Sequence, residues 1–337
     1  MAQHNGKATA PLLAVNNLSI SFAHSAGETA ITRDISFTVA PGERVGVVGE
    51  SGCGKSVTGL ALMGLLPRRT ARVRGEIRFQ DRDLASLSAR EMRRLRGREI
   101  SMIFQEPMSA LDPVFTVGEQ LTETLRAHEK VGRKQARERA IAALEEVGIP
   151  SPHTRIDEYP YQFSGGMRQR VMIAMALICR PKLVIADEPT TALDVTVQAQ
   201  ITDLLCEISE TTGTALLFIT HDLGVVAETC SRLLTMYAGQ VVENAPVDDV
   251  LRQPRHPYSS GLLRSLPGLS ERGARLPSIP GRVPAADQMP AGCRFQARCP
   301  HAVAGCEQPQ DLLALNGGRL ARCWRTDQLH LPGAVNR

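Results

Sequence analysis

The stretch Gly49-Glu50-Ser51-Gly52-Cys53-Gly54-Lys55-Ser56 decides the fold, because it fits the pattern G-x-x-x-x-G-K-[ST] at every fixed position. It follows the apolar, β-branched run RVGVV at residues 44–48 and precedes the helix-compatible run at residues 57–66. A phosphate-binding loop needs this strand–loop–helix order. We therefore expect its backbone N–H groups and the following helix dipole to bind phosphate oxygens.

Two side chains of this loop have separate expected roles. Lys55 would reach the β and γ phosphates, and the Ser56 hydroxyl would bind Mg²⁺. The loop then supplies both the cradle and part of the metal site. Because such loops sit in sheets with parallel strands, the predicted class is α/β, a P-loop NTPase.

Polar residues follow two further predicted strands. The run at residues 183–186 ends in Asp187 and Glu188, and the run at 215–220 ends in His221. Ligands bind beyond the carboxyl ends of parallel strands, so these residues should share one site with the phosphate loop. We expect Asp187 to hold Mg²⁺, Glu188 to polarise the attacking water, and His221 to contact the γ phosphate.

A second candidate anion site begins at Ser164-Gly165-Gly166. Apolar residues at helical spacing follow it as far as Cys179, so these residues start a helix with free N–H groups. The residues alone leave open whether Ser164 binds an anion or only caps the helix. Most of the stretch from about 87 to 179 reads as a helical insertion, with one strand signal at 100–104.

Composition excludes several classes of protein. The 337 residues are 43% hydrophobic and 22% charged, as in ordinary globular proteins, and only 4% are aromatic. The longest apolar run has nine residues, at 171–179, where a membrane-spanning helix needs about 20. Residues 1–240 have 27 basic and 27 acidic side chains, which argues against nucleic acid as a partner. With no secretory signal visible, we expect the chain to stay in the reducing cytoplasm.

The motifs together resemble the nucleotide-binding subunit of ATP-binding cassette (ABC) transporters over about residues 12–245. The resemblance rests on five stretches of sequence, which are GESGCGKS (49–56), FQEPMSALDP (104–113), FSGGMRQR (163–170), LVIADEPTTALD (183–194) and ITHD (219–222). It implies a RecA-like core with an antiparallel β subdomain and a helical subdomain at about 87–179. Few aromatics and no coiled-coil arm argue against a non-transport ABC ATPase, the less favoured alternative.

The tail is similar to the C-terminal extension of dipeptide and oligopeptide importer ATPases. This similarity rests on HPYSSGLL (256–263) and GCRFQARCP (292–300), within an extension that we place at 246–337. The segment at 163–170 looks more like the D-type subunit than its F-type partner. Eleven of the 21 prolines occur from Pro246 onward, and residues 267–290 read as a linker.

The resemblance assigns further roles by position. Ser164, Gly165 and Gly166 would complete the ATP site of a partner cassette, with residues 192–194 across the dimer interface. Gln105 would sense Mg²⁺ and the attacking water, in a loop facing the membrane subunits. Phe22 would stack on adenine, although in an alternating strand it also fits the core.

Cys53 departs from the family pattern, in which serine is more usual. We regard it mainly as a small tolerated residue. The alternative is a reactive thiol whose pKa is lowered at a helix N-terminus, which would make the ATPase thiol-sensitive.

Four cysteines gather in the tail, at Cys293, Cys299, Cys306 and Cys323, and no C-x-x-C pair is among them. Zinc sites favour such short pairs, and the cytoplasm disfavours disulfides. Zinc and unligated thiols stay open, while the resemblance implies a [4Fe-4S] cluster in a small, loop-rich cysteine module. Its charge of roughly −2 would be offset by neighbouring arginines, at Arg294, Arg298, Arg322 and Arg325.

The implied function is the ATP-hydrolysing motor of an importer for dipeptides or oligopeptides, with nickel or haem as alternative cargo. The implied partners are a second cassette of the F type, two transmembrane permease subunits and, indirectly, an extracytoplasmic solute-binding protein. The implied location is peripheral, on the cytoplasmic face of the bacterial inner membrane.

Overall fold

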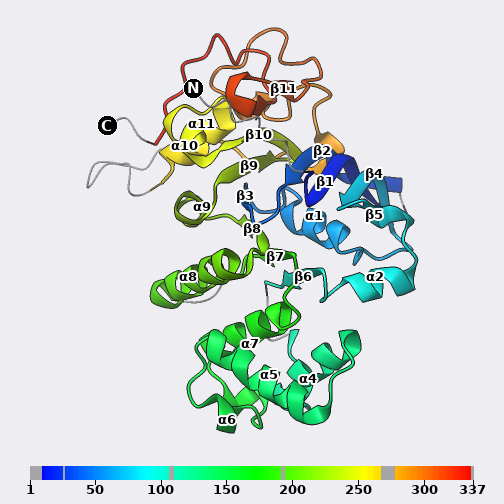
Figure 1. Ribbon diagram of the computed structural model, residues 1–337. Coiled ribbons are helices and arrows are strands. Elements are labelled where there is room, and N and C mark those ends of the chain that lie inside the picture. The colour runs from blue at the N-terminus through cyan, green and yellow to red at the C-terminus, as the bar shows by residue number, and fades with distance from the viewer. Residues whose placement is uncertain (1–9, 26, 106–109, 191–193, 267–277, 335–337) are drawn as a thin grey trace, which may run out of the picture.

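The computed structural model describes residues 10–25, 27–105, 110–190, 194–266 and 278–334. Residues 191–193, which include part of the expected dimer interface, lie outside this description, as do 106–109 and 267–277. The described chain contains two sheets with helices on either side (Figure 1).

The larger sheet carries the phosphate loop at its centre. Its eight strands in spatial order are β11 (Leu313–Ala314), β12 (Leu320–Ala321), β10 (Gln240–Pro246), β9 (Arg232–Tyr237), β3 (Arg44–Val48), β8 (Ala215–Thr220), β7 (Leu183–Asp187) and β6 (Ile100–Ile103). Strands β9, β3, β8, β7 and β6 are parallel, whereas β10, β12 and β11 pair in antiparallel fashion. The predicted runs at 44–48, 183–186 and 215–220 are thus strands of one parallel sheet. Strands β6, β7 and β8 are buried along their whole length, as parallel strands between helices should be.

The smaller sheet is antiparallel and lies beside α1 (Lys55–Leu62) (Figure 1). Its strands in spatial order are β2 (Gly27–Val39), β1 (Leu13–His24), β4 (Ala71–Phe79) and β5 (Arg82–Asp83). Leu13, Ile35 and Phe79 from this sheet share one core with Val45 and Leu217 of the larger sheet. The short η1 (Leu84–Ser86) and α2 (Ala89–Leu95) follow β5.

The helical insertion forms the end of the molecule opposite the C-terminal extension (Figure 1). It contains α4 (Val117–His128), α5 (Arg133–Glu146), α6 (Pro152–Arg155), η2 (Pro160–Gln162) and α7 (Gly165–Leu177). Leu121, Leu144 and Val171 bury their side chains in its core, which continues into β7 through Val184. Thr116 and Glu119 form a capping box at the start of α4, and this fixes the point where the helix begins.

The remaining helices connect and cover the parallel strands. They are α8 (Val195–Thr212), α9 (Leu223–Thr229), α10 (Val247–Arg252) and α11 (Pro257–Arg264). After α11, the described chain has little regular structure beyond η4 (Ala286–Gln288), η5 (Gln296–Arg298), η6 (Asn316–Gly318) and the strands β11 and β12.

The C-terminal extension is joined to the cassette through the sheet. Strand β12 pairs with β10, with Glu243 opposite Ala321 and Asn244 opposite Leu320. The tail is loop-rich, as expected, but its two strands extend the edge of the cassette's own sheet. The expected small cysteine module is therefore not a unit of its own, because the strands of the tail belong to the sheet of the cassette.

Candidate nucleotide site

The phosphate loop joins β3 to α1 at the centre of the parallel sheet. Gly52 and Gly54 have positive φ angles of 80° and 96°, conformations that favour glycine and that let the loop curl above the helix N-terminus. The Lys55 ammonium donates to the carbonyl oxygens of Gly49 at 2.8 Å and Glu50 at 3.3 Å. Lys55 therefore lies across the loop with its charge on the side where phosphates would bind.

Ser56 and Asp187 form the oxygen pair expected for Mg²⁺. The Ser56 hydroxyl donates to Oδ1 of Asp187 at 2.9 Å, and the Asp187 side chain is buried at the end of β7. Burial raises the pKa of Asp187, while the hydrogen bond from Ser56 acts in the opposite direction. Hydroxyl and carboxylate oxygens beside a phosphate loop are the ligands that Mg²⁺ prefers, so these residues fit the ion.

Gln105, Glu188 and His221 meet at the carboxyl ends of three neighbouring strands. Gln105 Nε2 lies 3.2 Å from Glu188 Oε2, and His221 Nδ1 lies 3.3 Å from Glu188 Oε1. The Glu188 backbone is left-handed, with φ at 46°, and its N–H donates to the Ile219 carbonyl at 2.8 Å. Such a conformation is uncommon outside glycine and is concentrated at functional sites. The structure thus places Glu188, the predicted base, in contact with both Gln105, predicted to sense the attacking water, and His221, predicted to contact the γ phosphate.

The turn at Ser164, Gly165 and Gly166 lies at the start of α7 in the helical layer. The Ser164 hydroxyl accepts from the N–H of Met167 at 3.3 Å, so it does cap the helix. Ser164 and Gly165 are exposed. Among the described residues, no hydrogen bond or ion pair joins this turn to the phosphate loop of the same chain.

Phe22 and Cys53 both pack against the core shared by the two sheets, and the stacking of Phe22 on adenine stays a prediction. Phe22, on β1, is half-buried against the core shared by the two sheets. Cys53 is fully buried, and burial raises the pKa of its thiol despite the nearby Lys55 charge. The alternative of a lowered pKa at Cys53 is therefore wrong, because desolvation of the thiolate exceeds the attraction of the lysine.

The four tail cysteines line one small cavity. Phe295, His256 and Trp324 are among the other residues that line it, and burial raises the pKa of Cys299 to about 11. Within the described residues, no group of three or more His, Cys, Asp or Glu side chains is placed to hold a metal ion. The cysteines thus share a cavity, but they form no ready site for a single ion such as zinc.

The arginines near these cysteines mostly bind other groups. Arg294 donates to the Ala238 carbonyl, Arg322 to Val241 at 2.9 Å, and Arg298 to the Glu50 carboxylate at 2.9 Å. Arg325 alone of the four lines the cavity. Three of these arginines attach the tail to the cassette, and Arg298 is the one whose charge is already paired with a carboxylate. Compensation of a cluster charge by the other arginines stays a prediction.

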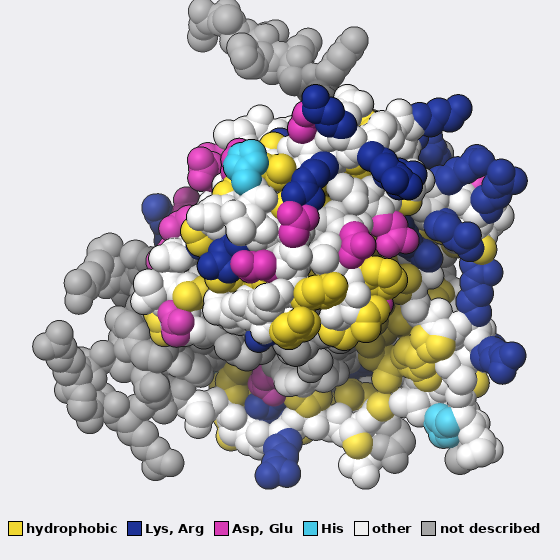
Figure 2. All heavy atoms as spheres, turned by 90° about the horizontal axis from the view of Figure 1, so that it is seen from below, with side chains coloured by type: hydrophobic (Ala, Val, Ile, Leu, Met, Phe, Trp, Pro, Cys, Tyr) yellow, Lys and Arg dark blue, Asp and Glu magenta, His cyan; other side chains and the backbone are white. Residues whose placement is uncertain are grey.

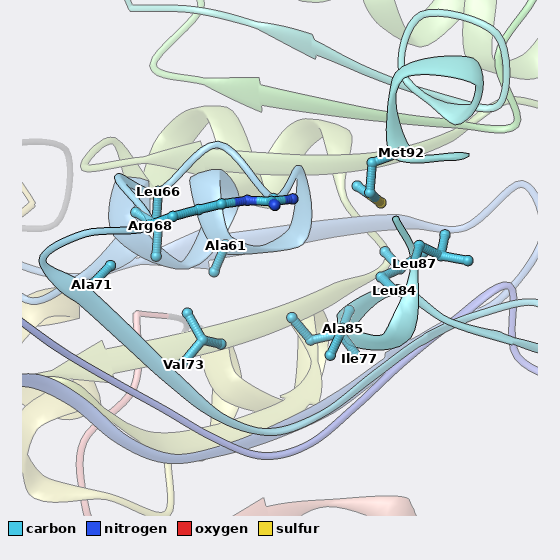
Figure 3. Close-up of a pocket in the computed structure, with 11 residues that line it drawn as sticks. Ala61, Leu66, Arg68, Ala71, Val73, Ile77, Leu84, Ala85, Leu87 and Met92 are labelled. Atoms are coloured by element: carbon cyan, nitrogen blue, oxygen red, sulfur yellow. The ribbon is translucent and has the colours of Figure 1, made fainter. Parts of the chain in front are cut away.

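A separate apolar pocket of about 360 Å³ lies beyond the C-terminal end of α1 (Figure 3). Leu66, Val73, Leu87 and Met92 line it, and Arg68 extends along one wall. It contains no residue of the phosphate loop or of the three strand ends, so it is not part of the nucleotide site. No segment in the described ranges is long and apolar enough to cross a membrane as a helix.

Sequence reasoning missed two residues that contact the phosphate loop. Tyr258 Oη accepts from the Glu50 N–H at 2.9 Å, and Arg298 pairs with the Glu50 carboxylate. Tyr258 lies inside the segment HPYSSGLL and Arg298 immediately precedes Cys299. Nothing in one sequence indicates that residues more than 200 positions away approach the loop.

Comparison with known proteins gives matches to both parts of the chain. Residues 32–191 match the ABC transporter family, and residues 242–306 match the family described as "Oligopeptide/dipeptide transporter, C-terminal region". The oligopeptide transport ATP-binding protein OppD of Salmonella typhimurium is 50% identical, over 93% of each chain. The dipeptide transport ATP-binding protein DppD of Bacillus subtilis is 49% identical, over 94% of this chain and 95% of that one.

Solved structures match the cassette. An ADP- and phosphate-bound dimer of the ATP-binding cassette MJ0796 superimposes with a TM-score of 0.63 at 25% identity, covering 70% of this chain and 98% of that one. The cbiO1 subunit of Clostridium perfringens gives 0.61 at 27% identity, covering 71% and 90%. Fold and site together define a P-loop ATPase built as an ABC cassette. The chain belongs to the ABC transporter ATPases, in the group that carries the oligopeptide/dipeptide transporter C-terminal region.

Proposed function

We propose that this chain is the D-type, ATP-hydrolysing subunit of an importer for dipeptides or oligopeptides. The contact of Glu188 with both Gln105 and His221 beside the phosphate loop carries the hydrolytic part of the proposal, and the matched C-terminal region supports the peptide-importer part. In this reading Glu188 takes the proton of the attacking water, Gln105 orients that water, and His221 contacts the γ phosphate. Mg²⁺, bound by Ser56 and Asp187, would neutralise charge on the phosphates.

Glu188→Gln tests the hydrolytic part of the proposal. Without the carboxylate, phosphate release by the assembled transporter should fall about a hundredfold or more, while ATP still binds. ATP binding is measured with a fluorescent analogue. Glu228→Gln, a change of the same kind at an exposed position on α9, serves as the control and should keep full turnover. Unchanged turnover in Glu188→Gln would remove this residue as the base.

The partner assignments follow from exposure and from the matched C-terminal region. Ser164 and Gly165 are exposed at the start of α7, where the dipole and free N–H groups suit the phosphates of a facing cassette. We assign that cassette to a distinct F-type chain, and the import path to two permease subunits with an extracytoplasmic binding protein. Uptake of labelled dipeptides, longer peptides, nickel and haem by cells with and without this chain separates the possible cargoes.

An iron–sulfur cluster is the cofactor that the four tail cysteines suit best. Four soft thiol donors line a single cavity, and a four-iron cluster takes one thiolate for each iron. Cys293, Cys299, Cys306 and Cys323 would be its ligands, with a structural role. Anaerobically purified chain should then contain iron and sulfide and absorb broadly in the visible range.

Two controls make the cofactor test decisive. Cys306→Ser should lose both iron and visible absorbance, whereas Cys206→Ser, on α8 and away from the cavity, should retain them. A colourless wild-type sample with stoichiometric zinc would contradict the cluster.

We further place the chain peripherally on the cytoplasmic face of the membrane, because one of its surfaces is strongly basic. Residues 68–98 contain eleven arginines and four acids, a net charge of +7 in a chain whose total is +4. Ten of the arginines are exposed on β4, β5, α2 and their connections, and we call them the arginine face: Arg68, Arg69, Arg72, Arg74, Arg78, Arg82, Arg90, Arg93, Arg94 and Arg98. Figure 2 shows basic side chains gathered along the side of the molecule on which these elements lie in Figure 1. Anionic phospholipid headgroups are the partner that its charge fits.

A further inference from the structure

The C-terminal extension holds the phosphate loop at Glu50. The Glu50 carboxylate accepts from Arg298 Nη1 at 2.9 Å, and the Glu50 N–H donates to Tyr258 Oη at 2.9 Å. Side chain and backbone of one loop residue are thus bound by two residues of the tail. The Arg298 side chain is only 6% exposed, so this ion pair is shielded from solvent on the arginine side.

Both tail residues are themselves rigidly held. Arg298 donates through Nε to the Pro280 carbonyl at 2.8 Å, and its guanidinium lies 5.7 Å from the ring centre of Tyr237. Tyr258 packs against Tyr237 at 4.6 Å and Phe295 at 5.4 Å between ring centres. All three rings are buried. The contacts on Glu50 therefore come from a packed aromatic cluster, not from a mobile surface loop.

The Glu50 carboxylate has an electrostatic consequence for nucleotide binding. It belongs to the loop that would surround the phosphates of ATP, and an unpaired negative charge there would repel them. Arg298 neutralises it, while Tyr258 fixes the N–H of the same residue. From the other side, Lys55 contacts the Glu50 carbonyl at 3.3 Å.

We propose that Arg298 and Tyr258 are positioning residues of the ATP site, so that the C-terminal extension completes the phosphate loop of its own chain. Arg298 cancels the repulsion between Glu50 and the nucleotide, and Tyr258 sets the loop backbone. Phe295 and Cys299, which flank Arg298, line the cysteine cavity. The inference rests on ATP binding at Gly49–Ser56, as proposed above.

A double-mutant cycle on full-length protein tests the pair, with the Kd for a fluorescent ATP analogue in Mg²⁺ as the readout. Arg298→Gln should weaken binding about tenfold, because it leaves the Glu50 charge unpaired beside the phosphates. Glu50→Gln should tighten binding, since it leaves Arg298 as an unpaired cation. The double variant should return close to the wild-type Kd. A merely structural role for Arg298 would give no such rescue.

Three further variants separate the outcomes. Arg322→Gln removes another buried arginine of the tail, which binds Val241 and Gln310 and not the loop. It should lower stability to urea without weakening ATP binding tenfold. Tyr258→Phe removes only the acceptor for the Glu50 N–H and should weaken binding severalfold; it also tests the proposal if Arg298→Gln does not fold. Lys55→Ala should abolish binding.

The results distinguish this inference from the proposed function. If Lys55→Ala still binds ATP, the proposed nucleotide site is wrong. If Lys55→Ala loses binding but folded Arg298→Gln and Tyr258→Phe both keep the wild-type Kd, only the positioning role is overturned. The positioning role is also overturned if the loss of ATP affinity in Arg298→Gln persists unchanged in the double variant, because that loss would then not come from the Glu50 charge.

Discussion

The cysteine in the phosphate loop shows how burial overrides a favourable electrostatic position. Cys53 lies next to Gly54 at the start of α1, where a helix dipole and Lys55 both favour a thiolate. Its side chain is nevertheless fully buried, and the pKa is raised rather than lowered. Attack by an alkylating reagent requires the thiolate and access to it, and Cys53 provides neither.

We accordingly expect Cys53 to resist alkylation in the native protein. After treatment with N-ethylmaleimide, mass spectrometry should find the Cys53 peptide unmodified, and modified once the protein is unfolded first. The ATPase of Cys53→Ser should lose activity to the reagent at the wild-type rate. Faster loss in wild type, with ATP protecting, would mean that the thiol is reactive after all.

The residues of the nucleotide site were predictable to different degrees. Ser56, Asp187, Glu188 and His221 follow from motif and strand order, because parallel strands end at one edge of a sheet. The left-handed backbone of Glu188 was not predictable, because its N–H is bonded to the carbonyl of Ile219 on a neighbouring strand that lies far away in the sequence. The local sequence pattern predicts which residues form the site, whereas contacts between distant parts of the chain determine how those residues are oriented.

The same contrast holds for strands and helices. Apolar runs predicted β3 and β8 to the residue, because fully buried parallel strands leave a continuous hydrophobic signature. Strands β11 and β12 have two residues each and leave none. Their existence depends on the free edge of β10, so the attachment of the tail to the sheet could not be seen in the sequence.

Glu243 on β10 is central to that attachment. Its carboxylate is fully buried and accepts from the N–H groups of Arg255 at 2.8 Å and His256 at 3.0 Å. Arg319, of the same extension, lies 3.4 Å away. One carboxylate of the cassette thus satisfies three donors of the tail.

We predict that Glu243→Ala lowers the free energy of unfolding by about 2–4 kcal/mol, because it leaves two backbone donors without an acceptor and the buried Arg319 without its ion-pair partner. Glu243→Gln should cost less, since its amide oxygen still accepts. Urea unfolding measures both, and Glu207→Ala, exposed on α8, should stay within about 0.5 kcal/mol of wild type. An equal effect of the two alanine variants would contradict this role for Glu243.

Taken as a whole, the molecule is electrically asymmetric in a way that total charge conceals. Residues 1–240 are neutral overall, yet residues 68–98 carry a net charge of +7, so the rest of that span must be acidic by the same amount. The pKa of Arg96 is lowered, first because the side chain is partly buried and second because the positive charges of Arg68 and Arg93 lie nearby. Like charges this close are unfavourable within the chain itself, which suggests an anionic partner that offsets the repulsion.

The arginine face should therefore bind full-length protein to phosphatidylglycerol vesicles and not to pure phosphatidylcholine, with binding that falls as salt is raised. Each arginine near the surface contributes about 1 kcal/mol, so replacing Arg72, Arg74, Arg93 and Arg94 together with glutamate should abolish cosedimentation. A control variant has glutamate in place of Lys130, Arg133 and Lys134, which lie just before α5 and in its first turn, outside this face. It should leave more binding intact. Equal binding to both vesicle types would exclude a lipid role; if the four-residue variant instead fails to assemble with detergent-solubilised permease, the face contacts acidic protein.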